Sequence, residues 1–254
     1  MKALKGKTIF ITGATAGFGH AMALRFAKEG ARIVATGRRE DRLKQLKKKL
    51  GDNAHTLTFD VRNYDEVKKA IGKLPAAFKD IDVLVNNAGL ALGMAKVPDT
   101  SLADWEQMVD TNIKGVLYCT ELLVPGMVKR GKGHIVNIGS VAGTYPYPCG
   151  NVYGATKAFI RQFSQNLRSD LLGKNIRVTN IEPGMAETEF SLVRYHGEKS
   201  KADAVYKGTR ALSAEDVAES ILFCLAQPPH INITVLEIMP TQQALAGFAV
   251  HRES

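Results

Sequence analysis

The chain contains no apolar run close to the roughly 18 residues that a membrane-spanning helix needs. Its N-terminus, residues 1–7, is basic and leads straight into a short strand-like run instead of the apolar core of a signal peptide. From these two absences we expect a soluble, cytoplasmic protein with no membrane partner.

Cysteine is also scarce. Cys119, Cys149 and Cys224 lie far apart and form no Cys-x-x-Cys pair. An odd number of widely spaced cysteines indicates neither a disulfide framework nor a zinc site. We expect reduced, mostly buried thiols and no bound metal.

Acidic residues are outnumbered, with 25 Asp and Glu against 34 Lys and Arg, which gives a net charge of +9. Such an excess can indicate nucleic-acid binding. However, only Lys44 and residues 47–49 form a basic cluster, and this cluster lies on a helical stretch where a solvated face is the simpler interpretation. We expect no nucleic-acid partner, although a basic surface can attract anionic substrates.

Apolar runs of strand length alternate with helical patterns along the whole chain, without a repeat or a linker. We expect strands at residues 7–12, 31–36, 55–59, 81–85, 134–138, 176–181 and 233–238, and helices at 17–30, 41–50, 64–74, 104–129, 153–171 and 214–226. This alternation predicts an α/β fold in which a doubly wound, seven-stranded parallel sheet carries helices on both faces, as in the Rossmann fold. We expect one domain over residues 1–254, with a polar tail at 249–254.

A glycine-rich loop joins the first expected strand to the first helix. Gly13, Gly17 and Gly19 fit a tight turn that lets the backbone approach a pyrophosphate at the helix N-terminus. Because the loop stands directly between a strand and a helix, we interpret it as a nucleotide site and not as a plain turn.

Two arginines, Arg38 and Arg39, follow the second expected strand, and the first acidic residue, Glu40, comes only after them. An acidic residue at this strand end accepts from the ribose 2′-hydroxyl of NAD, whereas arginine accommodates the 2′-phosphate of NADP. The sequence therefore favours NADP(H).

Polar residues also follow the next two strands. Asp60 can bond an adenine amino group or cap the helix that begins near Asn63, and the sequence leaves both open. Residues 86–89, Asn-Asn-Ala-Gly, suit close backbone approach to a ligand. Asn112 lies inside helical sequence, where asparagine is a poor helix former, so a functional kink is one explanation and a tolerated polar face is the other.

A tyrosine and a lysine four residues apart, Tyr153 and Lys157, share one face of an expected helix. There an ammonium can favour ionisation of a phenol, which makes it usable for acid–base chemistry nearer neutrality. Ser140 ends the preceding strand run. Farther along, residues 187–210 are polar and weakly patterned, as expected of a lid over a site.

Together these residues resemble the classical short-chain dehydrogenase/reductase family over essentially the whole chain, and most closely its NADP-dependent 3-hydroxy acid dehydrogenases. The sulfoacetaldehyde reductases look similar in the same places. The motifs that carry the resemblance are Thr12-Gly13-x-x-x-Gly17-x-Gly19, Asp60, Asn86-Asn87-Ala88-Gly89, Asn112, Ser140, Tyr153-x-x-x-Lys157 and Pro183-Gly184-x-x-x-Thr188. Phe18 departs from the smaller residue that is frequent there.

The resemblance implies a role for each matching residue. Tyr153 would exchange a proton with the substrate oxygen, Lys157 would lower the Tyr153 pKa and hold the nicotinamide ribose, and Ser140 would bond the same substrate oxygen. Asn112 would hold a water in a proton relay. The implied cofactor site comprises Gly13, Thr15, Gly17, Phe18, Gly19, Arg38, Arg39, Asp60, Val61, Asn87, Ala88, Gly89, Tyr153, Lys157, Pro183, Gly184 and Thr188.

The expected substrate is a small acid. Arg194 in the lid segment can clamp a carboxylate or sulfonate, or it can form a surface or interface salt bridge. Tyr147, Cys149 and Gly150 are expected to line the pocket, with Gly150 leaving room for the acid group. The implied activity is hydride transfer between NADP(H) and serine, 3-hydroxypropionate or 3-hydroxyisobutyrate, or the matching semialdehydes.

Other functions remain open at this point. One alternative is reduction of sulfoacetaldehyde to isethionate, and another is a non-catalytic protein that only senses NADP. The resemblance also implies a homotetramer that uses the helices at 104–129 and 153–171.

Overall fold

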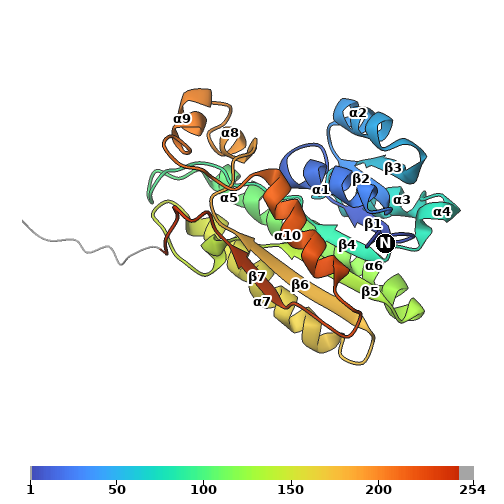
Figure 1. The fold of residues 1–254 in the computed structure, drawn as a ribbon. Coiled ribbons are helices and arrows are strands. Elements are labelled where there is room, and N and C mark those ends of the chain that lie inside the picture. The colour runs from blue at the N-terminus through green and yellow to red at the C-terminus, as the bar shows by residue number, and fades with distance from the viewer. Residues whose placement is uncertain (1, 246–254) are drawn as a thin grey trace, which may run out of the picture.

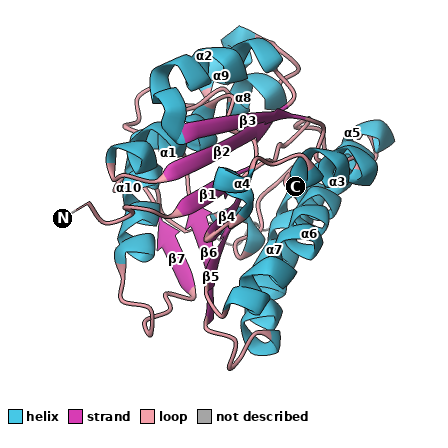
Figure 2. Cartoon of the chain, turned by 90° about the vertical axis from the view of Figure 1, so that its right-hand side faces the viewer, coloured by secondary structure: helices cyan, strands magenta, loops and turns pink. Residues whose placement is uncertain are grey.

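A single sheet of seven strands, in the order β3-β2-β1-β4-β5-β6-β7, runs through the centre of the computed structural model, which describes residues 2–245 (Figures 1 and 2). All of its strand pairs are parallel, which confirms the predicted fold class. The strands are β1 (Thr8–Ile11), β2 (Arg32–Gly37), β3 (Ala54–Thr58), β4 (Val83–Asn86), β5 (Gly133–Ile138), β6 (Ile176–Pro183) and β7 (Val235–Ile238).

The central strands form because their side chains are apolar on both faces. Phe10 of β1 lies beside Val34 of β2 and Leu84 of β4, and all three are fully buried. Strands buried on both faces are expected in a sheet that helices cover from two sides. The continuous apolar runs of the sequence are therefore the direct cause of the sheet.

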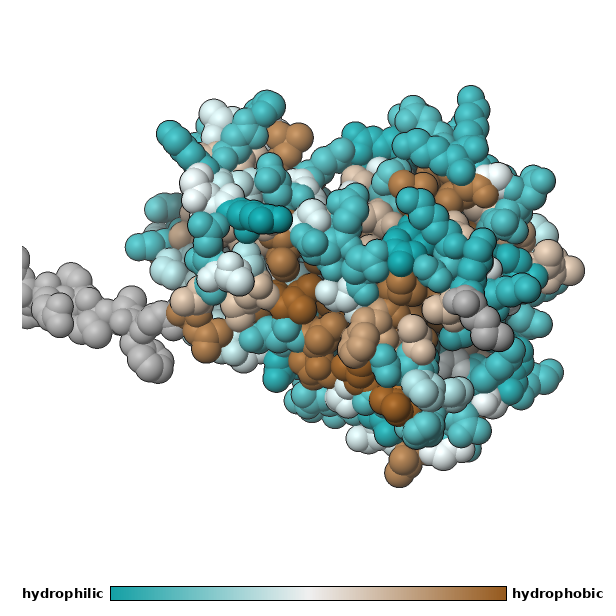
Figure 3. Space-filling view, in the orientation of Figure 1, coloured by the Kyte–Doolittle hydropathy of each residue, from teal (hydrophilic) through white to brown (hydrophobic). Residues whose placement is uncertain are grey.

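Helices cover both faces and enclose two separate apolar cores (Figure 2). One core lies under α1 (Gly17–Lys28), α2 (Glu40–Leu50) and α10 (Ala214–Ala226). The other lies under α3 (Tyr64–Gly72), α4 (Ala76–Lys79), α6 (Gly115–Arg130) and α7 (Asn151–Asp170). On the face shown in Figure 3, apolar side chains gather over α10 and beside β7, where Phe223 and Ile231 are exposed.

The helix boundaries largely follow the sequence. The expected helix at 104–129 is divided into α5 (Leu102–Val109), a π-helical turn at Asp110–Lys114 and α6. Ser213 and Asp216 form the reciprocal hydrogen bonds of a capping box at the start of α10. The short helix α4 was not expected, because Pro75 suggested only a break.

The lid segment contains two short helices, α8 (Phe190–Arg194) and α9 (Lys199–Ala204), which project beyond the end of the sheet (Figure 1). Short 3-10 turns occupy Gly51–Asn53 and Val141–Gly143. Within residues 2–245, no helix is long and apolar enough to cross a membrane. The polar tail predicted at 249–254 lies outside the described residues.

Candidate active site

A cavity of about 630 Å³ lies at the carboxyl ends of the strands. Ligands of open α/β sheets bind at this edge, where the strand order reverses, here between β1 and β4. The cavity reaches from the glycine loop to the lid. It is lined by most of the residues that the sequence singled out, namely Gly13, Thr15, Gly17, Phe18, Arg38, Arg39, Asp60, Val61, Asn87, Ala88, Gly89, Ser140, Tyr147, Tyr153, Lys157, Pro183, Gly184, Thr188 and Arg194.

The glycine loop is held close to the loop after β4. The Thr12 hydroxyl accepts from the backbone N–H groups of Asn87 and Ala88, both at 2.9 Å, and Asn87 Nδ2 donates to the Thr12 carbonyl at 2.8 Å. A Cβ on Gly19 would lie only 2.6 Å from Asn87 Nδ2. No larger side chain fits at Gly19, which is buried and lets α1 pack against the glycine loop but is not among the described residues that line the cavity.

The loop geometry fits a pyrophosphate. Gly13 has φ +68 and Gly17 has φ +50, a region that side chains rarely adopt. The Thr188 side chain lies 3.5 Å from the position of a Cβ on Gly17, so the chain after β6 comes close to the N-terminus of α1 here. Gly13, Gly17 and Thr188 all line the cavity, so the residues present fit a dinucleotide whose pyrophosphate lies on the glycine loop.

The two arginines after β2 differ in their surroundings. Arg38 is mostly exposed, and its nearest anion is Asp60 at 3.7 Å. Arg39 instead donates from Nε and Nη2 to Thr15 Oγ1, at 3.0 and 2.8 Å, and from Nη1 to Glu189 at 3.0 Å. Both side chains line the cavity where the 2′-phosphate was expected. The guanidinium of Arg38 forms fewer contacts with other side chains than that of Arg39 does.

Asp60 does not cap the following helix, so that alternative is wrong. Asn63 is the cap residue, and its own side chain accepts from the Glu66 backbone N–H. Asp60 lies on the cavity wall and is bound by Arg62 at 2.7 Å. Burial alone would raise the pKa of Asp60, but hydrogen bonds from Arg62 and the charge of Arg38 lower it below its usual value. The contact with adenine stays a prediction.

Asn112 lies in the π-helical turn between α5 and α6 and is buried. Its Nδ2 donates to the Leu90 carbonyl at 2.8 Å and to Thr156 Oγ1 at 3.0 Å, and its Oδ1 accepts from the Leu90 backbone N–H at 2.9 Å. A π-helical turn therefore interrupts the helix at Asn112, and both amide hydrogens of its side chain are in use. The predicted proton relay would have to use the remaining lone pair of Oδ1 or the backbone of the turn.

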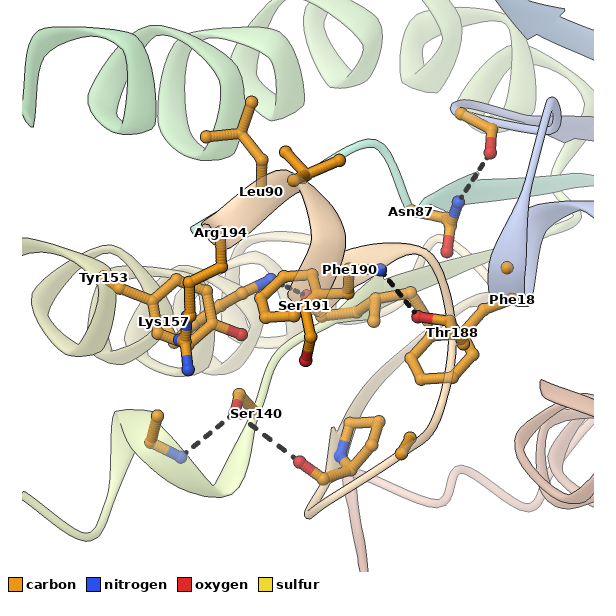
Figure 4. Close-up of a pocket in the computed structure, with 18 of the residues that line it drawn as sticks. Phe18, Asn87, Leu90, Ser140, Tyr153, Lys157, Thr188, Phe190, Ser191 and Arg194 are labelled. Atoms are coloured by element: carbon orange, nitrogen blue, oxygen red, sulfur yellow. Dashed lines mark hydrogen bonds between the residues drawn. The ribbon is translucent and has the colours of Figure 1, made fainter. Parts of the chain in front are cut away.

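The three residues Ser140, Tyr153 and Lys157 meet at one end of the cavity (Figure 4). Ser140 Oγ accepts from the Ala142 backbone N–H at 3.1 Å, which fixes the hydroxyl at the end of β5. The Lys157 ammonium donates to the Ile138 carbonyl at 2.7 Å and lies 5.8 Å from the centre of the Tyr153 ring. Helix α7 carries the tyrosine and the lysine on one face, as the spacing predicted.

Burial controls the titration of this group in the protein without cofactor. It raises the pKa of Tyr153 to about 12, an effect that the Ser140 hydroxyl and the charge of Arg194 partly oppose. It lowers the pKa of Lys157 from 10.5 to about 8. The charge that lowers the Tyr153 pKa here is that of Arg194 and not, as the resemblance implied, that of Lys157.

The side chain of Arg194 projects from the lid helix α8 and lies over the ring of Tyr153 (Figure 4). Its guanidinium carbon is 5.1 Å from the ring centres of Tyr153 and Phe190, and Nη2 donates to the Tyr147 hydroxyl at 2.9 Å. Among the described residues Arg194 forms no salt bridge, and its buried Nε has no hydrogen-bond partner. The surface ion pair considered for it is therefore not what the structure has.

Cys149 and Gly150 were expected to line the pocket, but neither is among the described residues that do so. The ring of Tyr147 fills the space beside Gly150, since a Cβ there would lie 2.5 Å from Tyr147 Cε1. Gly150 thus makes room for a tyrosine and not for a substrate group. Cys149 has φ +67 in the turn before α7.

Sequence reasoning missed two residues at the cofactor end of the cavity, Arg42 and Glu189. Arg42 Nη1 lies 2.7 and 2.8 Å from the two carboxylate oxygens of Glu189. Arg42 had a signal, because it lies in the first turn of α2, three residues after Arg39 at the start of that helix. Glu189 had none, because its partners are about 150 residues away in the chain. Among the described residues, no group of three His, Cys, Asp or Glu side chains could hold a metal ion.

Comparisons with known proteins agree with this site. The profile of the short chain dehydrogenase family matches residues 7–198. Serine 3-dehydrogenase from Agrobacterium fabrum is 56% identical over 247 residues, covering 97% of this chain and 99% of the relative. NADP-dependent 3-hydroxy acid dehydrogenase from Escherichia coli K12 is 53% identical over 246 residues, covering 96% and 99%.

Solved structures give the same result. The closed form of a serine dehydrogenase complexed with NADP+ superposes with a TM-score of 0.96 at 53% identity, covering 97% of this chain and 100% of the other. Serine dehydrogenase from Escherichia coli superposes with a TM-score of 0.82 at 48% identity, covering 93% and 99%.

Proposed function

This chain belongs to the short-chain dehydrogenase family, and we propose that it is an NADP-dependent oxidoreductase of short 3-hydroxy acids, serine among them, and of the matching semialdehydes. The observation that carries the proposal is the placement of Arg194. Its guanidinium lies against the ring of Tyr153, its side chain lines the cavity, and its buried Nε has no hydrogen-bond partner among the described residues.

The residues around Tyr153 can perform both directions of the reaction. Bound NADP(H) supplies the acceptor or donor of the hydride. In oxidation the Tyr153 phenolate takes the hydroxyl proton of the substrate, and in reduction the phenol returns it to the carbonyl oxygen. Ser140 holds that oxygen and donates to it as negative charge develops. Lys157 uses one donor on Ile138, so two N–H groups remain for the ribose hydroxyls of the cofactor.

Arg194 explains why the substrate should be an acid. A guanidinium matches a carboxylate with two parallel hydrogen bonds, and these are stronger than neutral ones. Because Arg194 stacks on the catalytic ring, a carboxylate bound to it would lie only a few bonds from the carbon that reacts. This arrangement favours short chains. Sulfoacetaldehyde remains the alternative substrate, since a sulfonate offers Arg194 similar oxygens.

The test is an absorbance assay of NADPH formation or loss with serine, 3-hydroxypropionate, 3-hydroxyisobutyrate, isethionate and neutral alcohols of equal length. We expect turnover of the carboxylic acids with NADP. Tight NADP binding without turnover of any compound would instead support a protein that only senses the cofactor.

The role of Arg194 is tested by Arg194→Ala, with Arg210→Ala, an exposed arginine of the same lid segment, as the matched control. Loss of a charge-assisted contact worth roughly 1.5–3 kcal/mol should raise the KM for acids about 10- to 100-fold and leave neutral alcohols unchanged. Equal effects on acidic and neutral substrates would refute the clamp.

We further infer a homotetramer, in line with the family resemblance, and a cytoplasmic location, where the free thiols of Cys119, Cys149 and Cys224 stay reduced. The stacked rings of Phe159 and Phe163 on α7, 5.5 Å apart, offer apolar surface on one of the helices expected at the interface. Sedimentation analysis tests the assembly, and a monomer at micromolar concentration would refute it.

A further inference from the structure

The lid is attached to the cofactor end of the cavity through Glu189. This residue immediately precedes α8, and Arg194, over Tyr153, is at the other end of the same short helix. The Glu189 carboxylate accepts from Arg39 at 3.0 Å and from Arg42 at 2.7 and 2.8 Å. One residue of the lid therefore binds two arginines of α2 and of the turn before it.

Three of the five N–H donors of Arg39 are already in use. The edge formed by Nε and Nη2 is on Thr15 Oγ1, and Nη1 is on Glu189. A phosphate that binds a guanidinium with two parallel hydrogen bonds needs two adjacent donors, so it must displace Thr15 from one edge or share Nη1 with Glu189 on the other. Arg38, in contrast, is 58% exposed and has only a distant contact with Asp60.

We propose that Glu189 is a specificity-determining residue, which competes with the 2′-phosphate of NADP for Arg39 and so sets the affinity of the site for phosphorylated ribose. The proposal rests on the proposed use of NADP. In it, Arg38 receives the 2′-phosphate directly, and Arg39 contributes only to the extent that Glu189 releases it.

Arg42 has a defined part in this competition. It contacts both carboxylate oxygens of Glu189 and does not line the cavity, among the described residues, as Arg38 and Arg39 do. It can therefore keep Glu189 in place when Arg39 turns to the phosphate. Without Arg42, the carboxylate would depend on Arg39 alone and would hold it more firmly.

The charges of Glu189, Arg39 and Arg42 are consistent with a measurable change in the affinity for a 2′-phosphate. The Glu189 pKa would rise by burial, but hydrogen bonds from Arg42 and Arg39 lower it, so the carboxylate is charged at neutral pH. The three side chains are 38 to 43% exposed. Ion pairs of this exposure are individually weak and screened by salt, so a change of about 3- to 10-fold is expected and not a complete loss.

Titration calorimetry on the protein without cofactor tests the proposal, with adenosine 2′,5′-bisphosphate and adenosine 5′-monophosphate as probes. Glu189→Gln should bind the bisphosphate about 3- to 10-fold more tightly at low salt and bind the monophosphate as the wild type does. The matched control is Glu187→Gln, which removes an exposed carboxylate two residues away and should change neither. Unchanged or weaker bisphosphate binding by Glu189→Gln would overturn the proposal.

A double-mutant cycle tests the part assigned to Arg42. Arg42→Ala alone should weaken bisphosphate binding about threefold, and in the Glu189→Gln background it should change binding less than twofold. If Arg42→Ala changed bisphosphate binding equally in both backgrounds, Arg42 would not act by holding the Glu189 carboxylate in place.

The wild type separates failure of this inference from failure of the proposed function. If the wild type does not prefer the bisphosphate over the monophosphate, the assignment of NADP itself fails. If it does prefer the bisphosphate and Glu189→Gln binds it equally well, only the role of Glu189 fails.

Discussion

Lys157 should make the stability of the protein without cofactor depend on pH, because the ammonium is buried and its only protein contact within hydrogen-bond distance, among the described residues, is the Ile138 carbonyl. Burial lowers its pKa from 10.5 to about 8. The unfolded chain therefore binds a proton on this side chain more strongly than the folded chain does. Where the unfolded state binds more protons, stability rises with pH, so Lys157 by itself should add stability between about pH 8 and pH 10.5. The buried thiols of Cys119 and Cys224, whose pKa values burial raises to about 12 and about 11, act in the opposite direction at alkaline pH.

The magnitude follows from the two pKa values. The full difference corresponds to about 3 kcal/mol, and roughly 1 kcal/mol of it falls between pH 7 and pH 9. Tyr153, whose pKa is about 12, does not titrate in this interval. Cys119 and Cys224 contribute alike to the wild type and to a Lys157 variant, so the difference between these two proteins is assigned to Lys157.

The measurement is urea unfolding of the wild type and of Lys157→Met at pH 7, 8 and 9, without cofactor. The difference in unfolding free energy between the two proteins should shift by about 1 kcal/mol in favour of the wild type over this range. Lys174→Met, which removes an exposed lysine, should show no such shift. Parallel pH dependences of wild type and Lys157→Met would refute a lowered Lys157 pKa. The same variant should lose turnover, since its cation is needed beside the phenol.

Further predictions concern the catalytic phenol, cofactor choice and the pocket wall. Tyr153→Phe should abolish turnover and leave NADP binding within about twofold, as seen by calorimetry, because it removes only the proton donor; retained activity would contradict its role. Neutral replacement of Arg38 and Arg39 together should raise the KM for NADP far more than the KM for NAD, with Arg38 responsible for most of the change. Gly150→Ala should displace the Tyr147 ring, whose hydroxyl accepts a hydrogen bond from Arg194. We expect the KM for acids to rise about tenfold and the KM for NADP to stay the same. An unchanged KM for acids would show that Tyr147 does not position Arg194.

Several features of the site were accessible from local sequence because they depend on short spacings. The four-residue interval between Tyr153 and Lys157 places both on one helix face. The glycines of the loop after β1 and the absence of an acid after β2 indicated a dinucleotide with a 2′-phosphate. These features depend only on the local strand, loop and helix, so they can be predicted before the rest of the fold is known.

Contacts between distant segments were not accessible. Arg194 looked equally suited to a surface ion pair, and only the folded lid places it on Tyr153. Gly150 was assigned to the substrate because nothing in the sequence shows that the Tyr147 ring lies against it. The sequence around Asp60 fits two roles, and only the structure shows that Asn63 is the helix cap.

The sequence by itself determined the seven strands, their parallel arrangement and the family, because buried strands and glycine turns leave patterns within a few residues. Tertiary structure alone decided which charges meet. Glu189 joins Arg39 and Arg42 across about 150 residues of chain, and Arg194 joins Tyr147 across 47. Such pairs depend on the packing of the lid against the sheet edge, and no local spacing encodes that distance.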